Sequence, residues 1–356
     1  MIILYPFIIA FIITALLTPL SLVVIKKMGL VDDPKLHKHP AMLHKKPTPR
    51  GGGIPLFIGI VITSIFFLPK TSAVIALFVA GSITLLIGVI DDKYDISPYL
   101  RFLANIAAAL IVVTAGITVP FITNPFGGIL YLNSIILPID FLGLHLSIAL
   151  SDVVAVLWII WVMNMLNWSK GVDGQMPGIV AISAVTIGLL SLRFAGSDSF
   201  SRVSVDLSFI IAGASLGFLI FNFHPAKIFP GYGATAVYLL LSAVSILSGA
   251  KLATAILVMG VPMMDGLFTI LRRLLAGRSP FWHDKKHLHH LLLSFGIGQR
   301  HIALFYWIIS AILGTLALVL SSKEKLFAII MLLIVVGGTL LFLHRILKNS
   351  YDKDRL

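Results

Sequence analysis

The chain has 356 residues, of which 58% are apolar and only 12% are charged, and it contains no cysteine. Soluble domains carry about a quarter charged residues, so this composition excludes an ordinary soluble protein. The lack of cysteine excludes disulfides and thiolate ligands. The net charge of +12 is explained by membrane topology and anionic lipid, and nucleic acid is not an expected partner.

Apolar runs recur from one end of the chain to the other, and each is about as long as the 20 or so residues that cross a bilayer as a helix. They are continuously apolar and do not alternate, which indicates helices. We therefore expect an all-α, polytopic membrane protein that forms a single domain over residues 1–356 and crosses the lipid bilayer about eleven times. The predicted spans are 2–25, 51–68, 72–90, 100–119, 150–166, 176–193, 206–223, 232–249, 252–272, 301–320 and 326–345.

The distribution of Lys and Arg predicts the orientation of the chain. All but six of the 27 basic residues fall on one side of the predicted membrane, in loops 26–50, 91–101, 167–176, 224–231 and 272–300 and in the tail from 345. This places the N-terminus outside, the C-terminus in the cytoplasm and the polar loops on the cytoplasmic face of the cell (inner) membrane. The first run lacks a small-residue cleavage site, so we expect it to be a retained span. The outer connection 120–149 contains short β-like runs that favour a small hairpin.

The first cytoplasmic loop and the end of the third span carry residues suited to phosphate chemistry. Thr48 and Arg50 precede the glycines 51–53, whose bare amides at a helix start suit phosphate oxygens, although a flexible turn is an equal alternative. Asp91 and Asp92 stand together at a helix C-terminus, which disfavours negative charge. Such a pair is expected if a divalent cation or an ammonium lies beside it, if it acts as a base, or if it simply ends the span in water.

Amide and aromatic side chains mark the next two cytoplasmic loops. Asn164 and Asn167 share one helix face, and the turn that follows presents Asp173. Such groups can read the edge of a nucleobase, and the alternative is a plain capped turn. Phe229, in a loop after Asn222, could stack on a base, although an isolated Phe is more often part of a core.

Histidines and an intramembrane acid mark the last polar region. Asp265 lies seven residues before Arg272, and a structural ion pair between them is slightly favoured over a functional role. A helix would align His283, His287 and His290, with His289 beside them. The spacing suits zinc, but the surrounding Lys and Arg side chains favour an anion such as phosphate.

Together these motifs resemble the polyprenyl-phosphate N-acetylhexosamine-1-phosphate transferase family, which is glycosyltransferase family 4. The likeness covers almost the whole chain and is closest to the branch that uses undecaprenyl phosphate and UDP-GlcNAc-like donors, a relative of phospho-MurNAc-pentapeptide transferase. It rests on the basic loop up to Gly52, on Asp91-Asp92, on Gly171-Val172-Asp173-Gly174, on Asn222-x-x-Pro225-Ala226-x-x-Phe229, on Pro262-x-x-Asp265 and on His287-Leu288-His289-His290.

The resemblance implies that the phosphate of a polyprenyl phosphate attacks the β-phosphorus of a UDP-N-acetylhexosamine and releases UMP, usually with Mg²⁺ (Mg2+). It implies that Asp91 orients or deprotonates the lipid phosphate, with Asp92 beside it, and that Asp91, Asp92 and Asp173 are the candidate metal ligands. The same comparison assigns the uridine to Asn167, Asp173, Asn222 and Phe229, and the diphosphate to His287, His289 and His290. Thr48, Arg50, Asn164 and Lys170 complete the expected substrate-binding set.

The chain departs from the family pattern at two acidic positions, where it has Lys170 and Tyr232. In the family the second position is a principal magnesium ligand, so ordinary metal binding is in question here. One hypothesis is that the Lys170 ammonium takes over part of the missing charge. A competing hypothesis is a catalytically silent binder of polyprenyl phosphate or nucleotide sugar, and a working phosphoglycosyltransferase is favoured over it because the other motifs are intact. Whether the chain forms a homodimer is left open.

Overall fold

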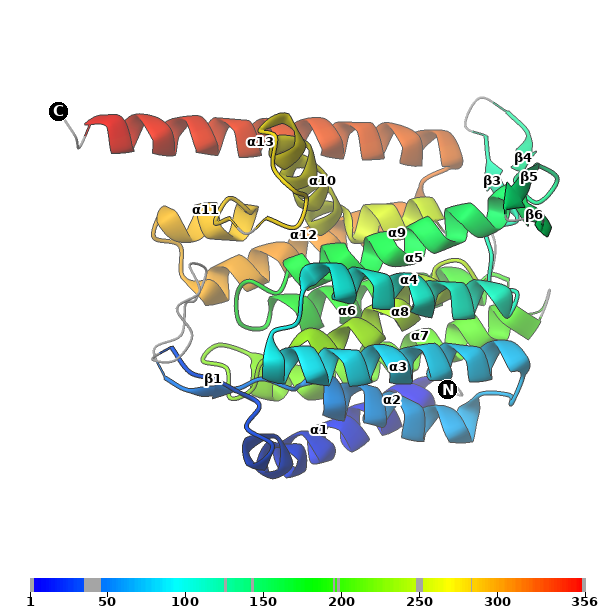
Figure 1. Cartoon of the computed structure of the whole chain (residues 1–356), viewed down its shortest axis with the longest axis horizontal. Coiled ribbons are helices and arrows are strands. Elements are labelled where there is room, and N and C mark those ends of the chain that lie inside the picture. Colours follow the sequence, from blue (N-terminus) through cyan, green and yellow to red (C-terminus); the bar gives the residue numbers. More distant parts are fainter. Residues whose placement is uncertain are drawn as a thin grey trace.

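The computed structural model describes residues 3–34, 46–124, 127–141, 144–194, 196, 199–247, 252–282 and 284–353. Most of these residues are helical, and Figure 1 shows the long helices lying side by side along one common direction. Within the described ranges, seven helices are long and apolar enough to cross a membrane, or eight if the bent pair of helices α9 and α10 is one span. The fold is therefore that of a polytopic helical membrane protein, as the composition predicts.

The seven long apolar helices are α1 (Leu4–Lys27), α3 (Ser72–Tyr94), α5 (Leu150–Trp168), α6 (Gln175–Leu192), α7 (Ser199–Asn222), α12 (Gln299–Val319) and α13 (Ser322–Lys353). Three shorter apolar helices lie among them, namely α2 (Gly53–Phe67), α4 (Pro98–Thr114) and α8 (Thr235–Val244), the last preceded by the 3-10 turn η1 (Tyr232–Ala234). The other described helices are α9 (Leu252–Val258), α10 (Gly260–Leu275) and α11 (Leu288–Ser294).

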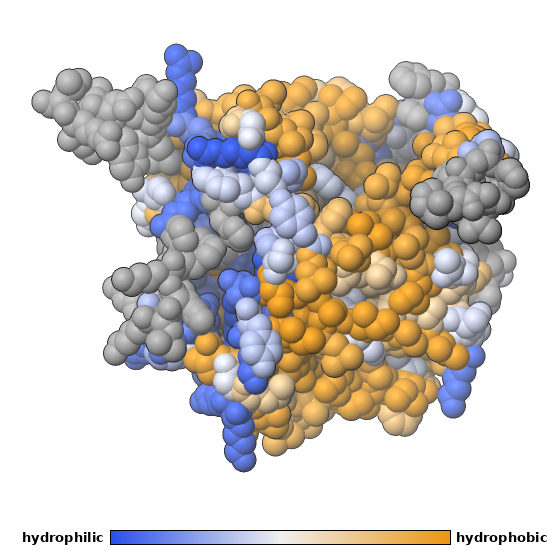
Figure 2. Space-filling model, viewed as in Figure 1, coloured by the Kyte–Doolittle hydropathy of each residue, from blue (hydrophilic) through white to orange (hydrophobic). Residues whose placement is uncertain are grey.

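The core of the bundle lies around α8, all of whose residues are buried, and around α6 and α7. The outer helices α1 and α13 instead expose large apolar side chains, of which Leu20 is 66% and Phe327 is 64% exposed. Figure 2 shows apolar side chains over the middle of the visible face, and hydrophilic ones at its two ends, above all at the end that carries β1 and α11. Exposed apolar side chains are stable in hydrocarbon but not in water, so this apolar middle zone marks the surface that faces the membrane.

The predicted span 252–272 is wrong as a single straight helix. It is two helices, α9 and α10, which meet at Met259 with a bend of 85°. Pro262 lies in the first turn of α10. A helix running through from Leu252 would lose the hydrogen bond from residue 262, because proline has no N–H, whereas the first turn of a new helix needs no such donor.

The predicted hairpin in the outer connection is confirmed, and there are two of them. Strand β3 (Phe121–Thr123) pairs with β4 (Ile129–Tyr131), and β5 (Ile136–Phe141) pairs with β6 (Leu144–Ala149), both antiparallel. Figure 1 places these hairpins at the end of the bundle opposite to β1 and α11.

A third short ladder joins β1 (Val31–Asp32) to β2 (Thr48–Pro49). It brings the two ends of the first polar loop together just before α2, next to the parallel bridge between Arg50 and Phe229. Residues 35–45 of this loop lie outside the described residues. The ladder thus places Thr48 and Arg50 against a loop that is far away in sequence.

Helices α2 and α3 approach the η1 turn so closely that only glycine fits at the contacts. A Cβ atom added at Gly88 of α3 would lie 2.4 Å from the Gly233 Cα, and one at Gly53 of α2 would lie 2.2 Å from the Gly233 carbonyl carbon. These clashes are with backbone, which cannot rotate away. The two glycines therefore fix where the 232–234 backbone lies.

We expect Gly88→Ala to lower the stability of the protein by about 1–3 kcal/mol, because the added methyl group overpacks a backbone contact. Thermal unfolding of the purified protein in detergent measures this as a fall of several degrees in the unfolding midpoint. Gly338→Ala is the matched control, since a Cβ there meets nothing within 4 Å on an exposed face of α13. A Gly88→Ala midpoint equal to that of the control would contradict the packing argument.

Candidate active site

The polar loops at one end of the bundle surround a single cavity of ≈ 1130 Å³. It is lined from five segments that are distant in sequence, namely β1–β2, the end of α3, the loops before α6 and α8, and the segment from α10 to α12. All the predicted site residues line it: Thr48, Arg50, Asp91, Asp92, Asn164, Asn167, Lys170, Asp173, Asn222, Phe229, His287, His289 and His290. Tyr232 lines it as well.

The acid pair at the end of α3 is neutralised by arginines. Arg101 Nη1 lies 3.1 Å from Asp91 Oδ2, and Arg50 Nη2 lies 3.9 Å from the same oxygen. Arg50 Nε lies 2.8 Å from Asp92 Oδ1. Both aspartate side chains are fully buried, so the guanidinium groups offset the repulsion expected between two carboxylates at a helix C-terminus.

Asp92 also holds the η1 turn. Its Oδ1 accepts the Tyr232 N–H at 2.7 Å, and its Oδ2 accepts the Gly233 N–H at 3.4 Å. Gly231 has φ +66°, and a Cβ there would lie 2.1 Å from Asp92 Oδ2. The carboxylate therefore packs directly on the loop backbone, and a side chain at position 231 is excluded.

Lys170 and Tyr232 fill the space beside the acid pair. The Lys170 ammonium donates to the Gly231 carbonyl at 2.9 Å and lies 5.6 Å from the centre of the Tyr232 ring. The Arg101 guanidinium lies 5.3 Å from the same ring. Burial lowers the pKa of Lys170 to about 7, and the charge of Arg50 adds to this effect while Asp92 opposes it. At neutral pH this amine, which lies next to two carboxylates in a poorly solvated place, is therefore charged in only part of the molecules.

The prediction of bare glycine amides for phosphate is wrong. The Gly51 and Gly52 N–H groups donate to the Phe229 carbonyl at 3.3 and 2.9 Å, and the Gly53 N–H donates to the Pro230 carbonyl at 2.8 Å. The free donors expected at a helix start are therefore occupied by a loop that the sequence places almost 180 positions away. These glycine amides join two loops, so a phosphate bound here would be contacted by side chains.

Asp173 and Asn222 hold the loops before α6 and after α7 together. Asp173 Oδ2 lies 2.7 Å from His224 Nδ1 and accepts the Ala226 N–H at 3.1 Å. Asn222 Oδ1 accepts the Gly174 N–H at 3.1 Å, and its Nδ2 donates to the Ile228 carbonyl at 2.8 Å. Both residues line the cavity, but these contacts join protein to protein.

The two predicted asparagines on α5 differ in their surroundings. Asn164 Nδ2 donates to the Ile160 carbonyl of its own helix at 2.8 Å. Asn167 Oδ1 is buried without a hydrogen-bond partner in the described part of the chain, and so are Asp91 Oδ1 and His289 Nδ1. Buried polar atoms are normally paired. These three atoms belong to residues that line the cavity.

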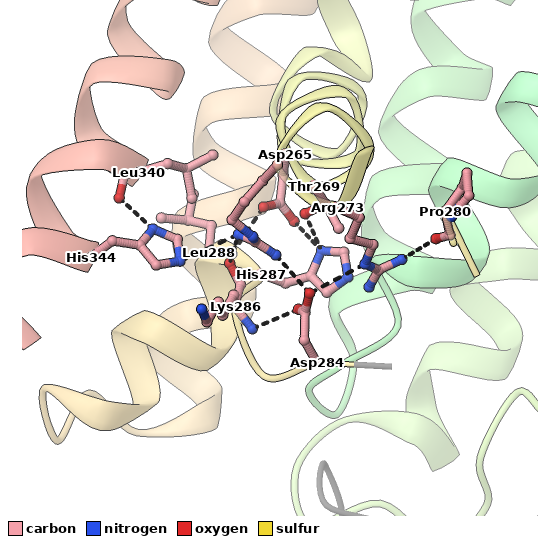
Figure 3. A network of polar contacts seen from close by, with 11 residues as sticks. Asp265, Thr269, Arg273, Pro280, Asp284, Lys286, His287, Leu288, Leu340 and His344 are labelled. Atoms are coloured by element: carbon pink, nitrogen blue, oxygen red, sulfur yellow. Dashed lines mark hydrogen bonds and ion pairs between the residues drawn. The ribbon is translucent and has the colours of Figure 1, made fainter. Parts of the chain in front are cut away.

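Asp265 lies against His287 (Figure 3). The favoured Asp265–Arg272 ion pair is wrong, because Arg272 pairs with Asp284. Asp265 Oδ2 lies 2.8 Å from His287 Nδ1, and its Oδ1 accepts the Leu288 N–H at 3.1 Å. An ionised carboxylate only accepts, so His287 Nδ1 carries the proton. Asp265 also replaces a local N-cap for α11, because it satisfies an N–H in the first turn of that helix.

The predicted helical row of three imidazoles does not form, because α11 begins at Leu288 and His287 precedes it in extended backbone. His283 lies outside the described residues. The rings cluster nevertheless: those of His287 and His289 are stacked with centres 5.6 Å apart, and those of His289 and His290 lie 4.2 Å apart. The imidazoles therefore come together where the extended backbone at His287 turns into α11.

Burial, with the charges of His290 and His287 adding to it, holds the pKa of His289 well below its usual range. Burial and the charge of His287 lower the pKa of His290 to about 4. At neutral pH both rings are therefore neutral, and each offers one N–H donor and one acceptor. The lack of a side chain at Gly171 makes room for the His289 ring, since a Cβ there would lie 1.9 Å from His289 Nε2.

Arg101 and Asp284, which the sequence analysis missed, both line the cavity. Asp284 lies 2.8 Å from Arg272 Nη2 and 3.2 Å from Arg273 Nε. Burial alone would raise the pKa of Asp284, but the Lys286 N–H and these two arginines outweigh it and lower that pKa to about 2. The sequence offers one signal for such residues, which is a charged side chain at the edge of an apolar run. Arg101, near the start of α4, is an example.

The carboxylates predicted as metal ligands already have partners within the protein. Among the described residues, no group of three or more His, Asp or Glu side chains is arranged to hold a metal ion. Both oxygens of Asp92 accept backbone N–H groups, Asp91 faces two guanidiniums, and Asp173 braces a loop. With Tyr232 and Lys170 beside them, the residues present do not fit a magnesium site of the predicted composition.

Known proteins match the chain along most of its length. Residues 74–249 match glycosyl transferase family 4. A probable undecaprenyl-phosphate N-acetylglucosaminyl 1-phosphate transferase of Bacillus subtilis (strain 168) is 32% identical, over 92% of this chain and 88% of the relative.

A decaprenyl-phosphate N-acetylglucosaminephosphotransferase of Mycobacterium tuberculosis (strain ATCC 25618 / H37Rv) is 33% identical, over 88% of this chain and 83% of that protein. The undecaprenyl-phosphate alpha-N-acetylglucosaminyl 1-phosphate transferase of Escherichia coli (strain K12) is 29% identical, over 82% of this chain and 77% of its own length. The chain therefore belongs to glycosyl transferase family 4, within the polyprenyl-phosphate N-acetylhexosamine-1-phosphate transferases.

Proposed function

We propose that this protein transfers N-acetylglucosamine 1-phosphate, or a closely related N-acetylhexosamine 1-phosphate, from a UDP-sugar to undecaprenyl phosphate. The observation that carries the proposal is the cavity at one end of the apolar bundle, which is lined by Arg50, Arg101 and Lys170 and by three residues with a buried polar atom that has no partner among the described residues. A lipid held in the bilayer and a nucleotide sugar from water can meet at such a place. The product would begin a lipid-linked cell-envelope glycan.

In the proposed reaction a phosphate oxygen of the lipid attacks the β-phosphorus of the UDP-sugar. A new P–O bond forms, and the bond from the β-phosphorus to the bridging oxygen breaks, so that UMP leaves with the electron pair. The products are undecaprenyl diphospho-sugar and UMP. Such phosphoryl transfers depend mainly on alignment and on neutralising charge around the transferring phosphorus.

The acid pair and its cations would serve the reacting phosphates. Arg50 and Lys170 supply positive charge, and Thr48 lies on the strand that leads to Arg50. Asp91 Oδ1 is buried and unpaired, so it can accept the proton of a singly protonated lipid phosphate and leave the attacking oxygen charged. Asp92 acts as a positioning residue through its contacts with the η1 turn.

The α5 end of the cavity would take the nucleotide. Asn167 has an unpaired acceptor that suits an N–H of uracil, and Phe229 offers a partly buried ring for stacking. We assign a structural role in this wall to Asp173, Asn222 and Asn164, because their side chains form hydrogen bonds with backbone groups of the protein. His289 and His290 would contact the diphosphate through ring N–H groups. His287, whose ring N–H is donated to Asp265, would hold the cluster in position.

Magnesium stays a prediction of the family resemblance. The remaining partners in the proposal are undecaprenyl phosphate, the UDP-N-acetylhexosamine and the bilayer.

For topology, we propose eleven crossings, in which the three short apolar helices and the bent pair span the membrane together with the seven long helices. The bent pair and the short helices support this count by their apolar composition. The cavity end would face the cytoplasm at the inner membrane, because the Lys- and Arg-rich loops gather there. The hairpins β3–β6 would lie outside.

Cysteine labelling tests this orientation directly, because the wild-type chain has no cysteine and serves as the unlabelled control. In spheroplasts we expect a membrane-impermeant maleimide to label Asn133→Cys, an exposed position beyond β4. Lys93→Cys, exposed at the cavity end of α3, should label only after lysis. Labelling of Lys93→Cys in intact spheroplasts would reverse the proposed orientation.

We expect Asp91→Asn to lower the turnover number by roughly 100-fold or more, since it keeps the size of the side chain but removes its charge and its basic oxygen. The assay is UMP release by the purified protein from UDP-GlcNAc and undecaprenyl phosphate. Asp152→Asn, in the first turn of α5 and outside the cavity, is the control and should retain wild-type turnover. A loss of less than tenfold in a normally folded Asp91→Asn protein would remove Asp91 from the mechanism.

A further inference from the structure

Basic side chains surround the acid pair. Asp91 and Asp92 face Arg50, Arg101 and Lys170, and Asp32 and Asp95 also act on Arg50. The two guanidinium groups stay charged, while the Lys170 amine, with a pKa of about 7, is charged in part of the molecules at neutral pH. A divalent cation brought to the acid pair would meet repulsion from these cations, whereas a phosphate would meet attraction.

Tyr232 holds two of these cations at defined positions. Its ring lies 5.3 Å from the Arg101 guanidinium and 5.6 Å from the Lys170 ammonium, within the range of cation–π attraction. Its hydroxyl accepts a hydrogen bond from Asn105 Nδ2 at 3.2 Å, and its backbone N–H is bonded to Asp92. The ring is thus fixed at both ends, and the cations on it are fixed in turn.

We propose that this site transfers the sugar phosphate without a divalent cation, because Arg50, together with Lys170 and Arg101 on the Tyr232 ring, supplies the positive charge that the substrate phosphates need. The proposal rests on the proposed function. Lys170 Nζ is bonded to Gly231, whose α-carbon lies against Asp92, so its charge stands at the acid pair itself. Fixed donors of this kind stabilise charge that develops in the transition state.

An ammonium and a metal ion are not interchangeable, and this makes the proposal testable. A metal ion binds several oxygens at once in a set geometry, while Lys170 is a single point charge on a flexible stem. The Arg50 and Arg101 guanidiniums supply the planar, multiple hydrogen bonding that the ammonium lacks. All three cations are therefore required together, and the loss of one is not repaired by magnesium.

The experiment measures UMP release by the purified wild-type protein from UDP-GlcNAc and undecaprenyl phosphate, in excess EDTA and in millimolar Mg²⁺. We expect the two rates to agree within about threefold. We expect Lys170→Met to lose roughly 100-fold or more in both conditions, which is the cost of removing one fixed donor. Lys227→Met, exposed and outside the cavity lining, is the matched control and should keep the wild-type rate.

Metal binding gives a readout that does not depend on activity. Thermal unfolding with and without Mn²⁺ should show no shift for the wild-type protein. The double variant Lys170→Asp with Tyr232→Asp restores two carboxylates and should gain both a metal-dependent increase in the unfolding midpoint and a requirement for Mg²⁺ in turnover. If that variant does not fold, the wild-type rates in EDTA and Mg²⁺ still decide the question.

The outcomes separate this inference from the proposed function. A wild-type protein that is active with Mg²⁺ and inactive in EDTA overturns the inference and leaves the proposed function standing. A folded wild-type protein that releases no UMP in either condition overturns the proposed function itself. Full activity of Lys170→Met in EDTA overturns the role of Lys170.

Discussion

The Asp92 carboxylate is the interaction on which the rest of the site depends. It joins three segments that are far apart in sequence: the end of α3, the η1 turn before α8, and Arg50 at the start of α2. It is buried, so the loss of its charge would leave two backbone N–H groups and a guanidinium without their acceptor. The glycines at 53 and 88 allow the approach that makes these contacts.

Buried charge at a membrane surface is stable only when it is paired, and here the pairing is arranged in two separate groups. Asp91 and Asp92 are matched by Arg50 and Arg101 on one side of the cavity. On the other side, Asp284 is matched by Arg272 and Arg273, and Asp265 by His287. Because these four acids already have partners, further positive charge at the cavity is available for a ligand.

Much of the polar chemistry in the loops builds the cavity wall and does not face a ligand. The glycine amides at 51–53, the Asn222 amide and one Asp173 oxygen all form hydrogen bonds between loops. Loops at the end of a helical bundle have few apolar contacts of their own, so these bonds give the wall its shape. A residue can therefore be essential to the site without touching a substrate.

The sequence by itself determined the helices and the residue types of the site, because apolar runs and polar loop motifs are local properties of the chain. It predicted neither the break at Met259 nor the partner of Asp265, and it missed the role of Arg101. Only the tertiary structure decided which donors meet which acceptors, since those partners lie tens to more than a hundred residues apart. For the same reason only the structure shows that Lys170 and Arg101 share the Tyr232 ring, where the motif alone shows two replaced acids.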